Sequence, residues 1–233
     1  MTIYISVNYD PGVAGSTDSR TTAPTSTGSR TAGTRTADTR TRLLDAGADL
    51  FRRQGYAATG LKRIVEEGDA PWGSLYHFFP GGKEQLGADA VTRAGEGYRR
   101  LIESVLDDDD PVASARALFR LGADALEASG FRDGCPVATV ALEAASTNEG
   151  LRAACAAVFV SWVEVLESHL VRSGVERRRA TALAWSGLAA FEGAIVLSRT
   201  LRTTAPLTAA AEHVADALSE AVDAPARRAG SGR

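Results

Sequence analysis

The sequence predicts an all-α protein of about nine helices, and three observations support this. Apolar residues recur at spacings of three and four through most of the 233 residues, as amphipathic helices require. Residues that start or end helices, such as Gly55 and the pair Asp110–Pro111, bound these stretches. Two short helical segments also meet at a tight turn within residues 56–83. We therefore expect a small N-terminal domain of three helices followed by a larger helical domain.

The first expected helix runs from Thr39 to Gln54. Its apolar positions, including Leu43, Leu50 and Phe51, make one stripe, and Gly55 is placed to end it. From Asp10 to about Asp38 the chain is mainly Ser, Thr, Gly, Ala, Pro and Arg. Because such a segment buries little apolar surface, we expect residues 1–38 to form a disordered arm. Its arginines could follow a DNA minor groove, although a solvated tail is the simpler alternative.

Residues 56–83 predict two short helices joined by a turn. Thr59 is a suitable N-cap for a helix carrying Ile64 and Val65 on its buried side. Gly68 and Asp69 form the break, where glycine tolerates positive φ. A second helix can then start at Pro71 as its first residue and stop before Pro80. Such a pair is a helix-turn-helix, in which the second helix enters the DNA major groove.

The outer face of this turn carries small and hydrogen-bonding side chains suited to DNA. Gly73 and Ser74 let the backbone approach base edges, while Tyr76, His77 and Lys83 offer donors to phosphates. The alternative is a helical hairpin buried in an all-α core. The residues predicted to bind DNA are Thr59, Lys62, Pro71, Trp72, Gly73, Ser74, Tyr76, His77 and Lys83.

The rest of the chain is expected to be helical, with residues 39–86 forming the helix-turn-helix domain, 87–223 the second domain and 224–233 a disordered tail. Asp110 is expected to cap a helix that begins at Pro111. The segment around Trp162 is apolar on most sides and should be central. The further helices are expected at Gly82–Leu106, Pro111–Ser129, Pro136–Ser146, Asn148–Val171, Glu176–Leu201 and Leu207–Val222.

The last two expected helices carry flat stripes rich in small residues, which permit close helix packing. Two recognition helices on a symmetric scaffold read a palindrome, whereas one reads too few base pairs. These stripes therefore predict a homodimer through a four-helix interface, with ordinary intramolecular packing as the alternative. The residues expected at the interface are Leu188, Phe191, Ile195, Val214 and Leu218.

Residues Arg40 to Gly97 resemble the N-terminal domain of the TetR family of bacterial repressors. The resemblance lies in LLDAGADLFRRQGY, in LYHFFP and in the GGK that follows it; GCPVATVALEAA is similar to the LmrA/YxaF-like branch. It implies a repressor that binds palindromic double-stranded operator DNA as a dimer and leaves it on binding a small-molecule effector. Trp72 departs from the family, which usually has Lys or Arg there. We expect Trp72 to stack or to contact a thymine methyl group.

The resemblance also implies an apolar effector pocket among the middle helices, with Glu192 and His169 as candidate polar groups. Each predicted wall residue could instead be ordinary core. Cys135 could act as a reactive thiol, although no neighbouring Lys or His favours this. The predicted wall residues are Phe119, Phe131, Leu142, Phe159, Trp162 and Trp185.

Charge and composition narrow the function. Residues 30–100 hold 12 Lys or Arg against 9 Asp or Glu, whereas residues 101–233 hold 13 against 18, so the basic part coincides with the proposed DNA-binding domain. The three histidines have no partners at ligand or triad spacing, and Asp107–Asp110 lacks a carboxylate at position 111. We expect no enzyme, cofactor, metal or membrane span, and a cytoplasmic, nucleoid-associated protein. A ligand-independent architectural DNA-binding protein is the rival function.

Overall fold

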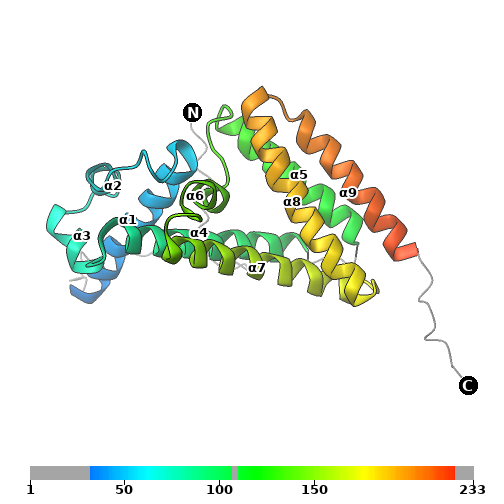
Figure 1. Ribbon diagram of the computed structural model, residues 1–233, viewed down its shortest axis with the longest axis horizontal. Coiled ribbons are helices and arrows are strands. Elements are labelled where there is room, and N and C mark those ends of the chain that lie inside the picture. Colours follow the sequence, from blue (N-terminus) through cyan, green and yellow to red (C-terminus); the bar gives the residue numbers. More distant parts are fainter. Residues whose placement is uncertain (1–31, 107–109, 224–233) are drawn as a thin grey trace, which may run out of the picture.

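The computed structural model describes residues 32–106 and 110–223, with side chains from residue 38 onward, and these ranges contain nine α-helices and no strand (Figure 1). The all-α prediction is confirmed. The predicted tail and most of the predicted arm lie outside the described residues. The helices are α1 (Ala32–Gln54), α2 (Leu61–Glu67), α3 (Trp72–Phe78), α4 (Gly82–Val105), α5 (Pro111–Ala128), α6 (Pro136–Ala144), α7 (Glu149–Arg172), α8 (Arg177–Leu201) and α9 (Ala205–Asp223).

Helix α1 begins at Ala32, seven residues before its predicted start. The composition did not predict this earlier start, because threonine and glycine are weak helix formers. The folded protein can override such weak propensities. Packing against α4 supports the described part: Arg40 forms an ion pair of 2.7 Å with Asp89, and Arg93 one of 2.6 Å with Asp45. Helix α1 ends as predicted, at Gly55 with φ of +88°.

The helix-turn-helix forms as predicted, but three of its local details differ. Gly60, not Thr59, is the N-cap of α2, and Pro71 is the N-cap of α3 rather than its first residue. In the turn, the residue with positive φ is Asp69 at +44°, whereas Gly68 has φ of −79°. Gly68 is instead needed for space, since an added Cβ would lie 3.2 Å from the Arg42 carbonyl oxygen.

One hydrophobic cluster runs from the helix-turn-helix into the second domain. It joins Phe51, Ile64 and Leu75 of the first three helices to Val140 of α6 and Leu151 of α7. The predicted domain boundary at residues 86–87 falls inside α4, which runs out of the N-terminal domain and lies along α7 (Figure 1). The two domains therefore share one core.

Helices α4 and α7 are in close contact because α4 carries glycine where they cross. A Cβ at Gly95 would overlap the side chain of Val158. The indole nitrogen of Trp162 also donates a hydrogen bond of 2.9 Å to the Gly95 carbonyl. As predicted, Asp110 caps α5 through Val112 N and Ala113 N at 2.9 and 3.0 Å.

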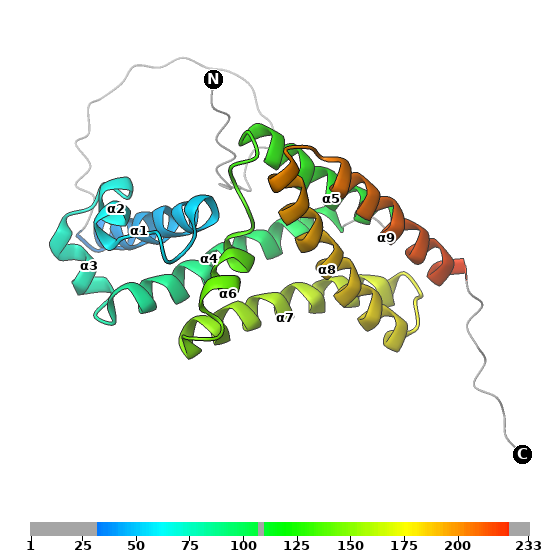
Figure 2. The same cartoon turned by 45° about the horizontal axis from the view of Figure 1, so that its top comes forward.

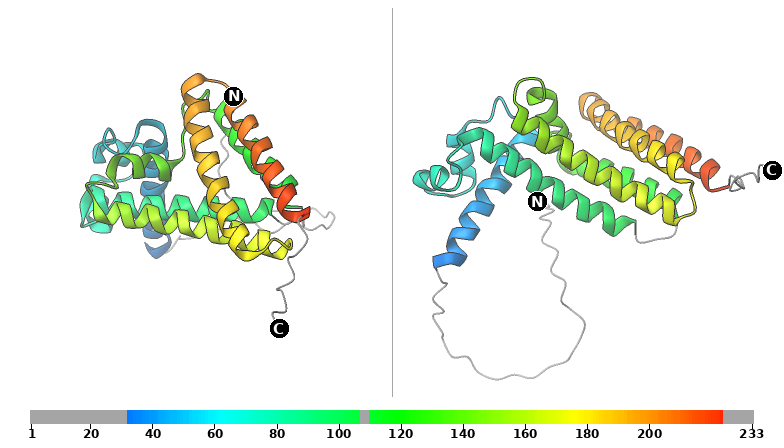
Figure 3. Two further views of the ribbon diagram at one scale, coloured as in Figure 1. Left: turned by 45° about the vertical axis from the view of Figure 1, so that its right-hand side comes forward. Right: turned by 60° about the horizontal axis from the view of Figure 1, so that its bottom comes forward.

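Helices α5, α8 and α9 form a second layer beside α4, α6 and α7 (Figures 2 and 3). Two smaller hydrophobic clusters hold this layer together, one of them through Leu207 and Ala211 of α9. Helices α7 and α8 are each long and apolar enough to cross a membrane by length and composition alone. The core position of α7, with Leu151, Val158 and Trp162 buried, accounts for its composition.

Candidate DNA-binding surface and effector domain

Helix α3 presents one buried side and one aromatic side. Leu75 is fully buried, whereas Trp72 and Tyr76 are 49% and 52% exposed. The two exposed rings stand one helical turn apart, with centroids 6.2 Å apart at an interplanar angle of 77°. This edge-to-face contact is a favourable aromatic geometry. The exposed side of α3 thus carries a paired aromatic surface.

Most of the other predicted DNA-binding residues of α2 and α3 are exposed to solvent. Pro71, Gly73 and His77 are exposed, and Ser74 is half-buried. A Cβ added at Gly73 would meet no atom within 4 Å, so the backbone there is open to a ligand. On α2 the Lys62 side chain is 84% exposed and lies 4.0 Å from Glu66. The structure thus leaves Lys62, Pro71, Gly73 and His77 accessible to a partner.

The prediction that Thr59 binds DNA is wrong. Thr59 is fully buried, and its hydroxyl donates a hydrogen bond of 2.7 Å to the Gly55 carbonyl while accepting one of 3.2 Å from Gln54. Threonine is a good N-cap residue, and an exposed position was expected for that reason. The buried hydroxyl instead closes the turn between α1 and α2.

Lys83 is not a free surface cation. Its ammonium lies 3.4 Å from the Ala57 carbonyl oxygen and 4.3 Å from the centroid of the Tyr56 ring. Partial burial lowers the pKa of Lys83, and the nearby carboxylate of Glu143 opposes that shift. Its predicted phosphate contact therefore competes with contacts inside the protein.

The six predicted pocket residues do not form one set. Trp162 is buried at the centre of the shared core, and Phe159 packs against it with ring centroids 5.7 Å apart. Phe119 and Phe131 belong to the separate cluster between α5, α8 and α9. Leu142 and Trp185 are 79% and 47% exposed, so their assignment to an enclosed wall is wrong. Helical spacing could not tell which side of α6 or α8 faces outward.

Two polar groups lie together inside the second domain. The carboxyl of Glu192 on α8 lies beside the thiol of Cys135, the N-cap residue of α6, and its Oε2 is buried without a hydrogen-bond partner among the described residues. Burial raises the pKa of Glu192 to about 7. Burial, and then the Glu192 charge, raise the pKa of Cys135 well above its ordinary value. A protonated thiol is a poor nucleophile, which argues against a reactive-thiol sensor. His169 is buried at the end of α7.

Two of the five residues predicted at the dimer interface are buried inside the chain. Ile195 and Leu218 are 8% and 4% exposed and belong to intramolecular clusters. Phe191 packs edge-on against Phe119, with centroids 5.3 Å apart, while Leu188 and Val214 are half-buried. The exposed face of α8 is instead apolar at Trp185, Ala189, Gly193, Val196 and Leu197. We call these five residues the outer α8 face.

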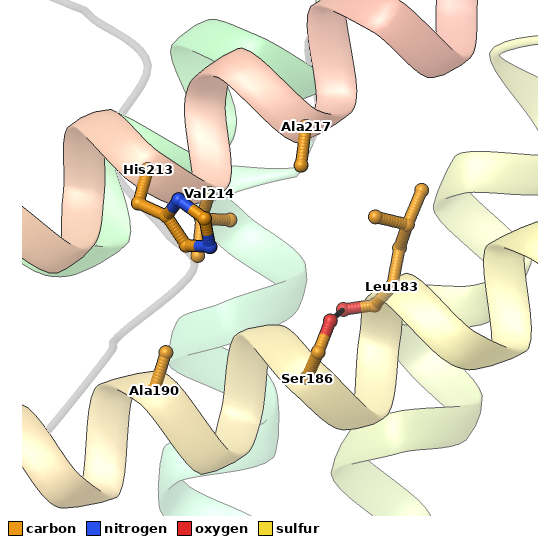
Figure 4. A pocket seen from close by; sticks show the side chains of 6 residues that line it. All are labelled: Leu183, Ser186, Ala190, His213, Val214 and Ala217. Atoms are coloured by element: carbon orange, nitrogen blue, oxygen red, sulfur yellow. Dashed lines mark hydrogen bonds between the residues drawn. The ribbon is translucent and has the colours of Figure 1, made fainter.

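A shallow groove of about 150 Å³ runs between α8 and α9 (Figure 4). Leu183, Ser186 and Ala190 line it from α8, and His213, Val214 and Ala217 from α9. It lies next to the outer α8 face. Within the described ranges, no group of three or more His, Cys, Asp or Glu side chains is placed to hold a metal ion.

Comparison with known proteins agrees with this arrangement. Residues 43–90 match the model of bacterial regulatory proteins of the tetR family, and residues 111–213 match that of the transcriptional regulator LmrA/YxaF-like C-terminal domain. The chain is 38% identical to the Bacillus subtilis regulator YxaF over 174 residues, covering 74% of this chain and 91% of that protein. It is 36% identical to the B. subtilis regulator LmrA over 167 residues, covering 71% and 89%.

Solved structures support the same fold. A TetR regulatory protein from Rhodobacter sphaeroides aligns with a TM-score of 0.70 at 23% identity, covering 77% of this chain and 98% of that one. A TetR regulator from Chloroflexus aurantiacus aligns with a TM-score of 0.65 at 27% identity, covering 80% and 97%. With an exposed helix-turn-helix, a shared helical core and relatives that are transcriptional regulators rather than enzymes, the chain belongs to the TetR family of DNA-binding transcriptional regulators, in its LmrA/YxaF-like branch.

Proposed function

We propose that this protein is a ligand-responsive repressor that binds a palindromic operator as a homodimer and is released by a small apolar effector. The observation that carries the proposal is the exposed side of α3, where Trp72 and Tyr76 form an aromatic pair next to an open backbone at Gly73. Neither ring belongs to a hydrophobic cluster of the described residues. Such a surface suits a helix that enters the major groove.

The proposed contacts divide into two kinds. Trp72, Gly73 and Ser74 at the start of α3 face base edges, as the first residues of a recognition helix do. Tyr76, His77 and Lys62 bind phosphates and set the position of the helix. With tryptophan at position 72, the site prefers an apolar partner such as a thymine methyl group over a guanine.

The proposed effector site lies among α4, α7 and α8, around Phe159 and Glu192. Phe159 is half-buried against the core, and the Glu192 carboxyl lies beside the Cys135 thiol with one oxygen buried. Ligand pockets commonly combine apolar walls with a few polar groups. An effector releases the operator only to the extent that it binds the DNA-incompetent arrangement more tightly.

The proposed dimer forms through the outer α8 face and the adjoining groove. Solvent-exposed Trp185, Val196 and Leu197, together with small residues between them, form a contiguous apolar stripe. Such a stripe marks an interaction surface, and a two-fold axis through it places two copies of α3 on one DNA molecule. The protein would act in the cytoplasm, at the nucleoid.

A selection of binding sites from random double-stranded DNA tests the function, followed by a footprint on the DNA beside the protein's own coding region. We expect enrichment of one inverted repeat with half-sites a helical turn or a multiple apart. An architectural protein would instead give diffuse protection, no enriched repeat and a steep salt dependence. That result would refute the specific repressor.

A further inference from the structure

Backbone groups at the end of α1 and in the turn after it form hydrogen bonds with α4, α6, α8 and the α5–α6 loop. We propose that Glu143, Lys83, Asp133 and Arg199 are positioning residues that lock the helix-turn-helix onto the effector domain and transmit its state to the DNA-binding face. These four residues, together with the backbone of Arg52, Arg53 and Ala57, are called the α1–body joint, where the body is the part of the chain from α4 onward. The proposal rests on the proposed function, since it concerns how effector binding reaches the DNA.

Ala57 is held on both sides of its backbone. Its N–H donates a hydrogen bond of 2.6 Å to Glu143 Oε2 on α6, and its carbonyl accepts one of 3.4 Å from Lys83 Nζ on α4. Two residues earlier, a Cβ at Gly55 would collide with the Glu143 carboxylate. Glycine at 55 therefore serves the positive φ that ends α1 and also leaves room for Glu143.

The last turn of α1 is held by two other elements. Arg199 on α8 donates a hydrogen bond of 2.8 Å to the Arg53 carbonyl, and Gly134 N donates one of 3.0 Å to the Arg52 carbonyl. Asp133 lies 3.4 Å from Arg52 and 3.5 Å from Arg53. The final carbonyls of a helix lack intrahelical partners. Here the second domain supplies the partners, so the C-terminal end of α1 is held by the α5–α6 loop and α8.

These contacts fix geometry rather than overall stability. Exposed ion pairs contribute little free energy, but four of the contacts end on backbone groups of residues 52, 53 and 57, which set the direction of the chain entering α2. The hydrogen bond from Thr59 Oγ1 to the Gly55 carbonyl stabilises that turn as far as the start of α2. A shift of α6 or α8 would therefore rotate α2 and α3 as one unit.

The joint also connects the proposed effector region directly to the DNA-binding domain. Asp133 and Gly134 are followed directly by Cys135, which lies beside Glu192, and Arg199 lies two helical turns after Glu192 on α8. Figures 1 and 3 show α6 lying between the N-terminal helices and α8. An effector that moves Glu192 or the 133–135 loop acts on the α1 carbonyls without passing through the length of α4.

The first test uses the protein alone, by amide hydrogen exchange. We expect Glu143→Ala to speed exchange at residues 55–67 while leaving α7 protected. The neighbouring Leu142→Ala, which removes a 79% exposed side chain, is the matched control and should change nothing. Glu143→Gln keeps an acceptor for Ala57 N and should restore most protection. Unchanged exchange in folded Glu143→Ala overturns the proposal.

The second test uses the inverted repeat selected by the wild-type protein and the same repeat lengthened by one base pair. A helix-turn-helix domain that is held less firmly to the second domain should tolerate the altered spacing. Glu143→Ala and Arg199→Gln should therefore lower the preference for the selected spacing by about tenfold. An unchanged preference in both folded variants overturns the proposal; Arg199→Gln decides alone if Glu143→Ala does not fold.

The variant Lys83→Ala distinguishes a role of Lys83 in the joint from a direct contact of Lys83 with DNA. As part of the joint, Lys83 affects spacing preference and leaves the salt dependence of binding unchanged. A salt slope lowered by about one with spacing preference intact identifies Lys83 as a phosphate ligand and removes it from the joint. If the wild type selects no repeat, the proposed function fails, and the exchange experiment still decides the joint.

Discussion

At the scale of single residues, chemistry depends on what surrounds each side chain. Trp72 and Thr59 were both predicted to contact DNA, yet Trp72 is 49% exposed and Thr59 is fully buried. The difference follows from their partners: the Thr59 hydroxyl donates a hydrogen bond to a backbone acceptor inside its own turn, whereas the Trp72 ring packs edge-on against the exposed Tyr76 ring. Residue type gave the candidates, and local hydrogen bonding separated them.

Replacing Trp72 tests base reading. We expect Trp72→Ala to reduce discrimination at one base pair of each half-site by about 1–3 kcal/mol, because the large apolar surface at the start of α3 is lost. Tyr76→Phe should instead weaken binding to all sequences alike, since it removes one phosphate donor. Binding constants on a set of single-base operator variants measure both. A uniform effect of both substitutions would show that this division of contacts is wrong.

The buried carboxyl of Glu192 predicts a pH dependence of stability. Its pKa is raised from 4.5 to about 7 by burial, so the folded protein keeps a proton that the unfolded chain has lost. The free energy of unfolding should therefore fall as pH rises from 4.5 to 7, by at most about 3 kcal/mol. Denaturant titrations across this range should show a shallower fall for Glu192→Gln. Parallel pH profiles would contradict this assignment.

At the scale of helices, small residues decide which elements lie close together. Helix α4 carries both Gly95, where a Cβ would overlap Val158, and Gly97, where a Cβ would meet nothing within 4 Å. The first glycine is required by packing against α7, and the second is not. The two positions, two residues apart on one helix, separate packing from helix propensity.

Gly95→Ala should destabilise the protein by about 1–3 kcal/mol, because the added methyl group forces α4 and α7 apart and disturbs the Trp162 hydrogen bond to Gly95. Gly97→Ala should be neutral or stabilising by up to about 1 kcal/mol, since alanine favours the helix. Thermal and denaturant unfolding measure the two differences. Equal effects of the two substitutions would contradict the packing argument.

At the scale of the whole molecule, the outer α8 face predicts assembly. Val196 is 49% exposed and belongs to that face, whereas Val160 is 43% exposed on α7 and does not. In sedimentation at about micromolar concentration we expect a dimer for the wild type and Val160→Glu, and a monomer for Val196→Glu, because a charge in an apolar interface is costly. A monomeric wild type, or dissociation of both variants, would refute this interface.

The sequence by itself determined the helical class, the helix-turn-helix and most helix ends, because these depend on local spacing and on capping residues such as Asp110 and Gly55. Only the tertiary structure decided which side of each helix is buried. Ile195 and Leu218 have the spacing of an interface but pack inside the chain, and Leu142 has the spacing of a core residue but faces outward. The α1–body joint also depends on contacts between residues far apart in sequence, which no local pattern specifies.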